Sequence, residues 1–430
     1  MKLIEEKREI PVIDEADICV LGGSCTGVFA AVRAARLGAK TVIVEKQNAF
    51  GGVAASSLVN IWHSLYDTEF KRQIIAGMTL ETVERLKRIG AVDERRNDIS
   101  AAYILNTEEL KIELDRLVME AGVKAHLHTQ FVAPYVKDGE LQAVVVENKS
   151  GRGAVKARLF IDATGDGDLC ARLGLGQRVS PMFQPSTMCA KISGWGKGGP
   201  AEARLAELIL EHGAEFGIPE GFAWSARVPG TGDVYLYAGT RVYHANNAEA
   251  EDLTRSEMEG RRQVRAIMDL LRKYRPECKL ALVSLPSNIG TRETRHIDCV
   301  YRLTGDDVLH GRPFPDAIAN GSYRVDIHHQ ERPGITFKYL DGRQVYARPG
   351  FPDQVSRWRE ATETNPTFYQ IPYRSILPKG PYRNVITAGR MLDADPEAFG
   401  GVRVMVNMNQ LGEAAGVAAV LALSRGAGFP

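Results

Sequence analysis

Blocks of apolar residues alternate with glycine-rich turns in the first part of the chain. Residues 17–21 (DICVL) form a short apolar run that predicts a buried strand. Residues 28–38 (VFAAVRAARLG) carry Ala and Leu at helical spacing and predict a helix ending at Gly38. Residues 40–45 (KTVIVE) predict a second strand that closes on an acidic residue. Strand, helix and strand in this order predict a βαβ unit and therefore a parallel sheet.

Later apolar runs extend this pattern. Residues 157–161 (ARLFI) and 384–387 (NVIT) predict two more short strands, and residues 404–424 predict a final Gly/Ala-rich helix. The stretches between them mix strands, such as 234–244 (VYLYAGTRVYH), with a long charged helix at about 248–274. We therefore expect an α/β fold, in which a mixed α+β cap is inserted into a Rossmann-type domain.

Composition excludes several classes of protein. The chain has 430 residues, which predicts two structural units or three. Lys and Arg number 54 against 53 Asp and Glu, and this balance argues against a nucleic-acid binder. No run of 18 apolar residues predicts a membrane span, and the charged N-terminus lacks a secretion signal, so we expect a cytoplasmic protein. The six cysteines form no CxxC pair and are interpreted as reduced thiols, which counts against a flavin–disulfide reductase.

A glycine-rich turn joins the first predicted strand to the first helix. In GGSCTG, Gly22 permits a tight turn and Gly27 lets the helix pack close to the sheet, while the helix N-terminus offers N–H groups to a pyrophosphate. Glu45 lies 18 residues beyond Gly27, where a carboxylate can bind a ribose diol. Ser24 stands where the motif normally has its middle glycine. We interpret the segment as a dinucleotide-binding loop; the alternative is an ordinary βαβ turn.

Further glycine-rich segments follow the other predicted strands: NAFGG, DATGDGD, AGR and the pair Gly400–Gly401. Together with their flanking residues, these segments resemble the FAD-dependent oxidoreductase family of the glutathione-reductase-like FAD superfamily. The matching strings span almost the whole chain: IPVIDEADICVLGG, VIVEKQNAFGGVAA, ELDRLVMEAGVKAHLHT, VVVENKSG, IDATGDGDLCARLG, IGTRETRHI, GSYRVDIH, IPYRSILPKG and NVITAGRMLDADPEAFGGVRVM.

The resemblance implies that several segments surround FAD. We expect FAD to bind without a covalent bond, because the residues around His63 differ from those of the related succinate dehydrogenase group, in which a histidine near this place carries the flavin. The resemblance also implies a discontinuous FAD-binding domain of residues 1–57, 102–175 and 368–430, and a substrate or cap insert of residues 58–101 and 176–367. The residues expected to contact the cofactor are Gly22, Gly23, Ser24, Cys25, Thr26, Gly27, Glu45, Lys46, Gly51, Gly52, Phe131, Val132, Ala163, Thr164, Gly165, Asp166, Gly389, Arg390, Val402, Arg403 and Val404.

Three of these expectations name a particular contact. Phe131 and Val132 are expected to pass the adenine through backbone atoms. Residues 402–405 are expected to place a helix N-terminus by the flavin pyrimidine ring, where its dipole favours the anionic reduced flavin. Arg390 is either a cofactor neighbour or one partner of a structural ion pair.

GWGKGG at 194–199 lacks the spacing of a second nucleotide fingerprint and predicts a loop, so we expect an external electron donor or acceptor.

The candidate catalytic residues are titratable or cationic groups from several segments. His328, in GSYRVDIH, suits acid–base chemistry because its ordinary pKa lies near ~6.5; its neighbour His329 should point elsewhere if the segment is a strand. TRETRHI carries Arg292 and Arg295, which could bind a carboxylate or form an internal salt-bridge cluster. The remaining candidates are His63, Tyr373 and Arg374. No residue set has metal-ligand spacing, so no metal is expected.

The expected function is oxidoreduction of a small organic metabolite by hydride transfer through FAD, as a dehydrogenase or a reductase. One alternative is a flavin-dependent monooxygenase or halogenase. An alternative of another class is an FAD-binding electron-relay or structural protein without its own substrate. An oligomer is compatible with the sequence, which does not name the substrate, the direction of the reaction or the electron partner.

Overall fold

A parallel sheet forms the centre of the computed structural model, which describes residues 3–181, 183–196, 198–221 and 223–429. Its parallel strands lie in the order β6 (Lys124–His126), β2 (Thr41–Val44), β1 (Val12–Leu21), β9 (Gly151–Asp162) and β22 (Val385–Thr387). The runs that predicted strands at 17–21, 40–45, 157–161 and 384–387 are thus β1, β2, β9 and β22. The predicted α/β fold is confirmed.

The long strand β9 belongs to two pairings along its length. Its first half pairs with β8 (Glu140–Asn148), which pairs with β7 (Gln130–Lys137), and both contacts are antiparallel. Its last residues pair instead with β22, where Val385 lies opposite Phe160. The carboxyl ends of β1, β2, β9 and β22 consequently meet at one edge of the sheet, which is where ligands bind in folds of this kind.

Helices α1 (Cys25–Arg36), α3 (Thr107–Glu120) and α10 (Met405–Ser424) pack together, and α1 and α10 pack on the central strands. Two glycines of α10 set its contact with α1. A Cβ atom on Gly412 would lie 2.0 Å from the carbonyl oxygen of Thr26, and one on Gly416 would lie 2.4 Å from that of Ala30. The two helix backbones therefore touch directly, which only glycine permits at these positions.

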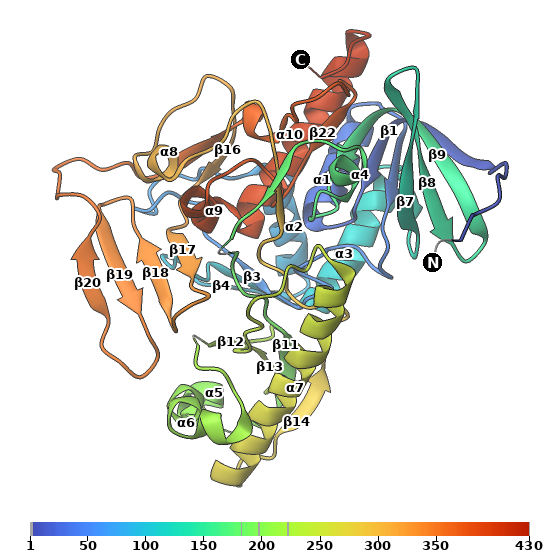
Figure 1. Cartoon of the computed structure of the whole chain (residues 1–430). Coiled ribbons are helices and arrows are strands. Elements are labelled where there is room, and N and C mark those ends of the chain that lie inside the picture. Colours follow the sequence, from blue (N-terminus) through green and yellow to red (C-terminus); the bar gives the residue numbers. More distant parts are fainter. Residues whose placement is uncertain (1–2, 182, 197, 222, 430) are drawn as a thin grey trace.

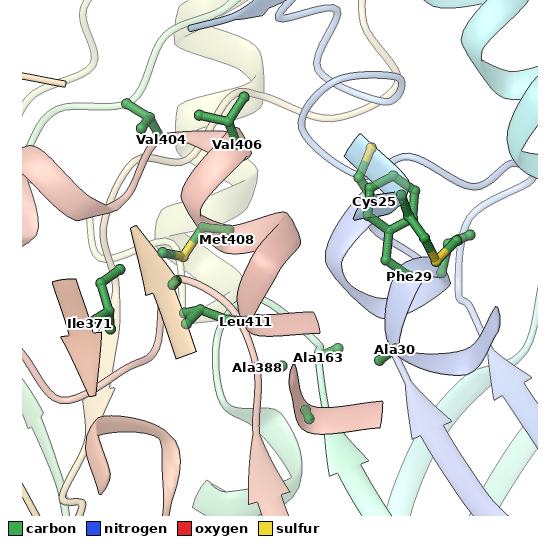
Figure 2. Packing of buried hydrophobic residues seen from close by; sticks show 14 of the residues in the cluster. Cys25, Phe29, Ala30, Ala163, Ile371, Ala388, Val404, Val406, Met408 and Leu411 are labelled. Carbon is green, nitrogen blue, oxygen red and sulfur yellow. The ribbon is translucent and has the colours of Figure 1, made fainter. Parts of the chain in front are cut away.

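The largest hydrophobic core lies under these helices. Figure 2 shows part of it, with Phe29 and Ala30 of α1, Met408 and Leu411 of α10, and the small Ala163 between them in the view. Helix α2 (Gly77–Arg88) contributes side chains to the same cluster and packs against α10 and α3. This helix lies in the first predicted insert, and the domain boundaries stay a prediction.

A second core lies in the arm that projects from the main body in Figure 1. Helix α7 (Ala250–Tyr274), the charged helix predicted at about 248–274, packs there with the short helix α6 (Leu205–His212). Beside them lies the antiparallel sheet of β12 (Trp224–Arg227), β13 (Tyr235–Ala238), β11 (Cys189–Ser193) and β14 (Ala281–Ser284). The loop predicted at 194–199 leads into α5 (Gly199–Glu202); its residue 197 lies outside the described residues.

Another antiparallel sheet carries the GSYRVDIH segment. Its order is β17 (Val325–His328), β18 (Ile335–Lys338), β19 (Arg343–Ala347) and β20 (Gln354–Arg357), and β17 contacts α9 (Pro396–Val402). The remaining helices are α4 (Asp168–Arg172), α8 (Gly305–Leu309) and the short 3-10 helices Gly213–Phe216 and Tyr373–Ile376. Three small sheets complete the fold. One has the order β3 (Ile61–Trp62), β5 (Tyr103–Leu105) and β4 (Val92–Glu94), the second pairs β10 (Gln177–Val179) with β15 (Arg295–Ile297), and the third pairs β16 (Ala317–Gly321) with β21 (Tyr369–Pro372). No helix in the described part of the chain is long and apolar enough to cross a membrane.

Candidate active site

A cavity of about 590 Å³ lies at the carboxyl ends of β1, β2, β9 and β22 and extends to the β17 segment. Sixteen of the residues expected to contact the cofactor line this cavity, and so do three of the candidate catalytic residues, His63, Arg292 and His328. The sixteen are Gly22, Ser24, Cys25, Thr26, Glu45, Lys46, Gly51, Gly52, Ala163, Thr164, Gly165, Asp166, Gly389, Arg390, Arg403 and Val404.

The turn after β1 has no room for a side chain at Gly22 or Gly27. Gly22 has φ +98°, and a Cβ atom there would lie 2.2 Å from the carbonyl oxygen of Ala163. A Cβ atom on Gly27 would lie 1.9 Å from the carbonyl oxygen of Gly22. Ser24 caps α1, since its side chain accepts a hydrogen bond from the Gly27 N–H at 3.3 Å. The cap leaves the earlier amides of the first turn directed at the cavity, where they favour an anionic ligand.

Glu45 is held rigidly at the end of β2. Its Oε2 accepts a hydrogen bond from the Gly23 N–H at 2.5 Å, and its Oε1 accepts one from the Gln47 N–H at 2.7 Å. The carboxylate is 8% exposed and still borders the cavity. This arrangement leaves lone pairs on both oxygens for a hydroxyl donor such as a ribose diol.

Arg390 forms an ion pair and also lines the cavity, so the ion pair does not exclude the predicted position of Arg390 beside the cofactor. Its Nη2 lies 2.6 Å from Asp166 Oδ1, which also accepts a hydrogen bond from Thr294 Oγ1 at 2.8 Å. Burial opposes ionisation of Asp166, but Arg390 and Thr294 outweigh it and hold the pKa of that carboxyl below its usual range.

Helix α10 points its N-terminus into the cavity. Its cap residue is Val404, which provides no side-chain hydrogen bond, and Met405, Met408 and Asn409 border the same space. Both amide atoms of Asn409 are buried without a partner in the described residues. Val402 instead lies in α9, fully buried and outside the lining, so the part of the expected 402–405 segment that reaches the cavity begins at Arg403.

Asp326 and His328 lie two residues apart on β17 and therefore point to the same side of the strand. His328 Nε2 lies 3.0 Å from Asp326 Oδ1, and Arg403 Nη2 lies 3.1 Å from the same oxygen. The Tyr323 hydroxyl donates to Asp326 Oδ2 at 2.8 Å. Asp326 is thus a shared acceptor that fixes three side chains at the cavity wall.

Burial keeps both cavity histidines neutral. For His328, burial and the nearby Arg292 lower the pKa to about 3, despite the opposing effect of Asp326. For His63, burial and Arg324 lower the pKa to about 3. Burial disfavours the charge of Asp326, but His328 and Arg403 hold its pKa well below the usual range. A neutral His328 with its proton on Nε2, beside an ionised Asp326, is the state consistent with these directions.

Three candidate catalytic residues lie away from the cavity lining. Arg295 donates to Asp168 Oδ1 at 3.0 Å and to the carbonyl oxygen of Ala248, so Arg292 and Arg295 do not form a pair of guanidinium forks. Arg374 pairs with Asp316 at 2.9 Å. The third residue, Tyr373, begins the 3-10 helix that also holds Arg374. Salt bridges within the protein therefore occupy both arginines.

The other residues outside the lining have visible structural roles. Gly23 and Gly27 hold the turn through the contacts described above. Phe131 is buried and lies under the Arg172 guanidinium, 5.3 Å from its ring centroid, while the Val132 carbonyl accepts a hydrogen bond from Arg172. Whether this backbone passes an adenine stays a prediction. His329 donates to, or accepts from, Thr336 Oγ1 at 2.8 Å and is absent from the lining, as its place on alternate faces of the segment predicts.

The sequence interpretation assigned no role at the cavity to several groups. Arg324, Asn409 and Arg95 all border it. Arg324 belongs to the same GSYRVDIH string as His328, so its neighbourhood was detectable, whereas nothing in the spacing of Asn409 or Arg95 connects them to the site.

Residues 17–429 match the family model described as FAD dependent oxidoreductase. The chain belongs to this family. Its fold is therefore that of a family of FAD-dependent enzymes, and FAD is its cofactor. The sequence-based prediction of the family, of the fold and of FAD as cofactor is confirmed.

Curated relatives match parts of the chain. The mitochondrial dihydrolipoyl dehydrogenase of Schizosaccharomyces pombe is 26% identical over 162 residues, which are 35% of this chain and 28% of that protein. Digeranylgeranylglycerophospholipid reductase 2 of Methanothermobacter thermautotrophicus is 25% identical over 217 residues, 48% of this chain and 53% of that protein. The chain thus spans about half, or less, of the length of these relatives.

A similar solved structure supports the fold. The geranylgeranyl bacteriochlorophyll reductase-like protein of Thermoplasma acidophilum has a TM-score of 0.51 and 13% identity, and the alignment covers 96% of this chain and 80% of that one. At this identity the likeness concerns the fold alone.

The residues present fit FAD. The tight turn at Gly22 precedes the N-terminus of α1, where the Ser24 cap uses the Gly27 N–H. Glu45 offers acceptors to a ribose, and the unpartnered Asn409 amide and the N-terminus of α10 offer polar groups to the flavin. Gly51 and Gly52 keep the adjoining wall narrow, because a Cβ atom on Gly52 would lie 2.7 Å from Ser24 Cβ. The backbone, more than side chains, shapes this part of the cavity.

Proposed function

We propose that this protein is an FAD-dependent dehydrogenase that oxidises a small hydroxylated or carboxylated metabolite. The observation that carries the proposal is the neutral His328, fixed by the ionised Asp326 at the wall of the cavity whose residues fit FAD. Removing a hydride from a hydroxyl-bearing carbon also requires a base for the hydroxyl proton, and a positioned neutral imidazole is suited to that task.

The hydrogen bond to Asp326 determines which ring nitrogen acts. With the Nε2 proton directed at Asp326 Oδ1, the Nδ1 lone pair of His328 is the acceptor that remains. Bound FAD supplies the acceptor for the hydride and its two electrons. His328 takes the hydroxyl proton, and the substrate becomes a carbonyl compound. The Asp326 carboxylate stabilises the imidazolium that forms.

Two relatives carry names of the same reaction class. One is called a dehydrogenase and the other a reductase, and both names describe redox conversion without insertion of oxygen. An external acceptor would then reoxidise the flavin, because only one nucleotide fingerprint is found in the sequence. The expected cytoplasmic location and the oligomeric state stay predictions.

The test is anaerobic mixing of the flavin-loaded enzyme with a library of hydroxylated and carboxylated metabolites, followed by flavin absorbance. We expect one group of related metabolites to bleach the flavin. If only NAD(P)H or reduced flavin reduces the enzyme and the product contains an oxygen atom from O₂, the protein is a monooxygenase. If no metabolite bleaches a flavin that electrode mediators do reduce, the electron-relay alternative holds instead.

A further inference from the structure

The cavity wall around Asp326 carries more positive than negative charge. Three guanidinium groups, those of Arg292, Arg324 and Arg403, border the cavity there together with the single carboxylate of Asp326. Of these three guanidinium groups, that of Arg403 lies within ion-pair distance of the Asp326 carboxylate, at 3.1 Å, and the other two do not. The two histidines at the same wall are neutral, so they neither add to this charge nor offset it.

Arg324 is positioned by neutral groups. Its guanidinium lies 4.3 Å from the ring centroid of Phe337, and its Nη1 donates to Ser100 Oγ at 2.5 Å. Its Nε is buried and has no hydrogen-bond partner, and no Asp or Glu of the described residues forms an ion pair with it. The side chain is thus held in place while its charge and one donor are left unsatisfied.

Arg292 is also held by neutral acceptors. Its Nη1 donates to the carbonyl oxygen of Pro185 and to Thr187 Oγ1, the latter at 2.6 Å, and both acceptors are neutral. No acidic residue in the described part of the chain pairs with it. The charge of Arg292 interacts electrostatically with His328 and Asp326, so Arg292 lies near the proposed acid–base pair.

An arginine stays protonated in proteins, and a part-buried cation without a counter-charge is costly unless a ligand supplies one. The other charged groups that border the cavity offset one another: the exposed Arg95 with Asp98, Arg390 with Asp166, and Lys46 with Glu45. The excess therefore belongs to the wall around Asp326. A planar guanidinium with free donors is suited to a carboxylate, which it can bind through two parallel hydrogen bonds.

We propose that the substrate is an organic acid and that its carboxylate binds Arg324 and Arg292, the two part-buried guanidinium groups of the cavity that no acidic side chain of the described residues pairs. This inference rests on the proposed function, which it narrows from small metabolites to carboxylates. The acid anchors the substrate at Arg324 and Arg292, beside the imidazole of His328 that receives the proton.

The test measures binding without turnover. The oxidised, flavin-loaded enzyme is titrated with propionate and succinate, and with propionamide and succinamide as neutral counterparts, while the flavin spectrum and the melting temperature are followed. We expect saturable changes with the carboxylates and none with the amides. Arg324→Met should weaken carboxylate binding about tenfold or more, because it removes charge-assisted hydrogen bonds, while FAD content stays unchanged.

Arg324→Lys keeps the charge and loses the fork, so it should retain part of the affinity. Arg272→Met is the matched control, because Arg272 pairs with Asp269 on the outer face of α7 and its side chain is 45% exposed. It should leave carboxylate binding unchanged.

Several results would overturn the proposal. These are equal binding of amides and carboxylates, no saturable change with any carboxylate, and unchanged affinity in both Arg324→Met and Arg292→Met. Loss of FAD from folded Arg324→Met or Arg292→Met protein would assign the guanidinium groups to the flavin instead. Carboxylate binding that persists while no metabolite bleaches the flavin would remove the proposed dehydrogenase activity and leave the binding site standing.

Discussion

The two ends of the cavity are built in different ways. At the strand ends, the wall consists of backbone and glycine, and its shape follows from close contacts such as that between Gly22 and Ala163. Around Asp326, the wall consists of charged and aromatic side chains. They come from β17 and the residues just before it, from the junction of α9 and α10, and from the segment that precedes β15. The first construction suits a ligand shared by many enzymes, and the second suits a ligand particular to this one.

Added side-chain atoms should disturb the glycine-lined end of the cavity more than the charged end. Gly22 and Gly38 have nearly the same φ, +98° and +95°, but a Cβ atom on Gly38 meets nothing within 4 Å. Gly22→Ala should weaken FAD binding about 1000-fold or more, since it adds a backbone clash to the strain of a positive φ. Gly38→Ala should cost only about 1–2 kcal/mol of stability and leave FAD binding intact. Equal FAD affinity in the two variants, measured by fluorescence titration, would contradict the predicted turn.

The α1–α10 contact supports the same end of the cavity. Gly412→Ala places a Cβ atom 2.0 Å from the Thr26 carbonyl oxygen, and we expect a loss of about 3 kcal/mol in the free energy of unfolding. Chemical denaturation of the holoenzyme measures it. Leu421→Ala, at a side chain that is 51% exposed on the same helix, should change that free energy by less than about 0.5 kcal/mol. A Gly412→Ala protein as stable as the Leu421→Ala control would show that the helices do not touch here.

The charged end should tolerate substitution structurally and respond in rate. His328→Ala should keep FAD bound and slow flavin reduction about 100-fold, because the substrate loses its base. Stopped-flow reduction with a bleaching metabolite provides the rate. His329→Ala is the control, since His329 contacts Thr336 and is absent from the cavity lining. If both variants reduce at the wild-type rate, His328 has no part in the reaction.

Low pH should lower the free energy of unfolding, because the folded protein keeps the buried His63 neutral. The pKa of His63 is about 3 in the folded protein and near ~6.5 when unfolded, so the unfolded chain binds more protons between these values. Stability is then complete above pH ~6.5 and falls as the pH drops toward 3. His63→Gln should remove about 2 kcal/mol of this loss at pH 5. Urea titrations at pH 5 and pH 8 measure it, and His310→Gln, at a 54% exposed side chain, should change nothing. The same pH dependence in both variants would mean that His63 is not buried as a neutral group.

The contrast between the two ends also determined what the sequence could predict. The strands, α1 and the turn at Gly22 follow from local periodicity and from glycine spacing, which depend on neighbours in the chain. The pairing of Arg403 with Asp326 joins residues far apart in sequence, and no local pattern contains it. For the same reason Arg292 and Arg295 looked alike in TRETRHI, although tertiary contacts send one to the cavity and the other to Asp168. His328 was singled out by the ordinary pKa of histidine, and its partner Asp326 lies two residues away on the same strand.

The flavin content of the purified protein tests the account most directly. Four glycine-rich segments, remote from one another in the chain, converge on one cavity, and this geometry predicts stoichiometric FAD that is released on denaturation. Protein stripped of flavin should take up FAD again and melt at a higher temperature with it than without it. Colourless protein that neither binds added FAD nor gains thermal stability from it would contradict the account.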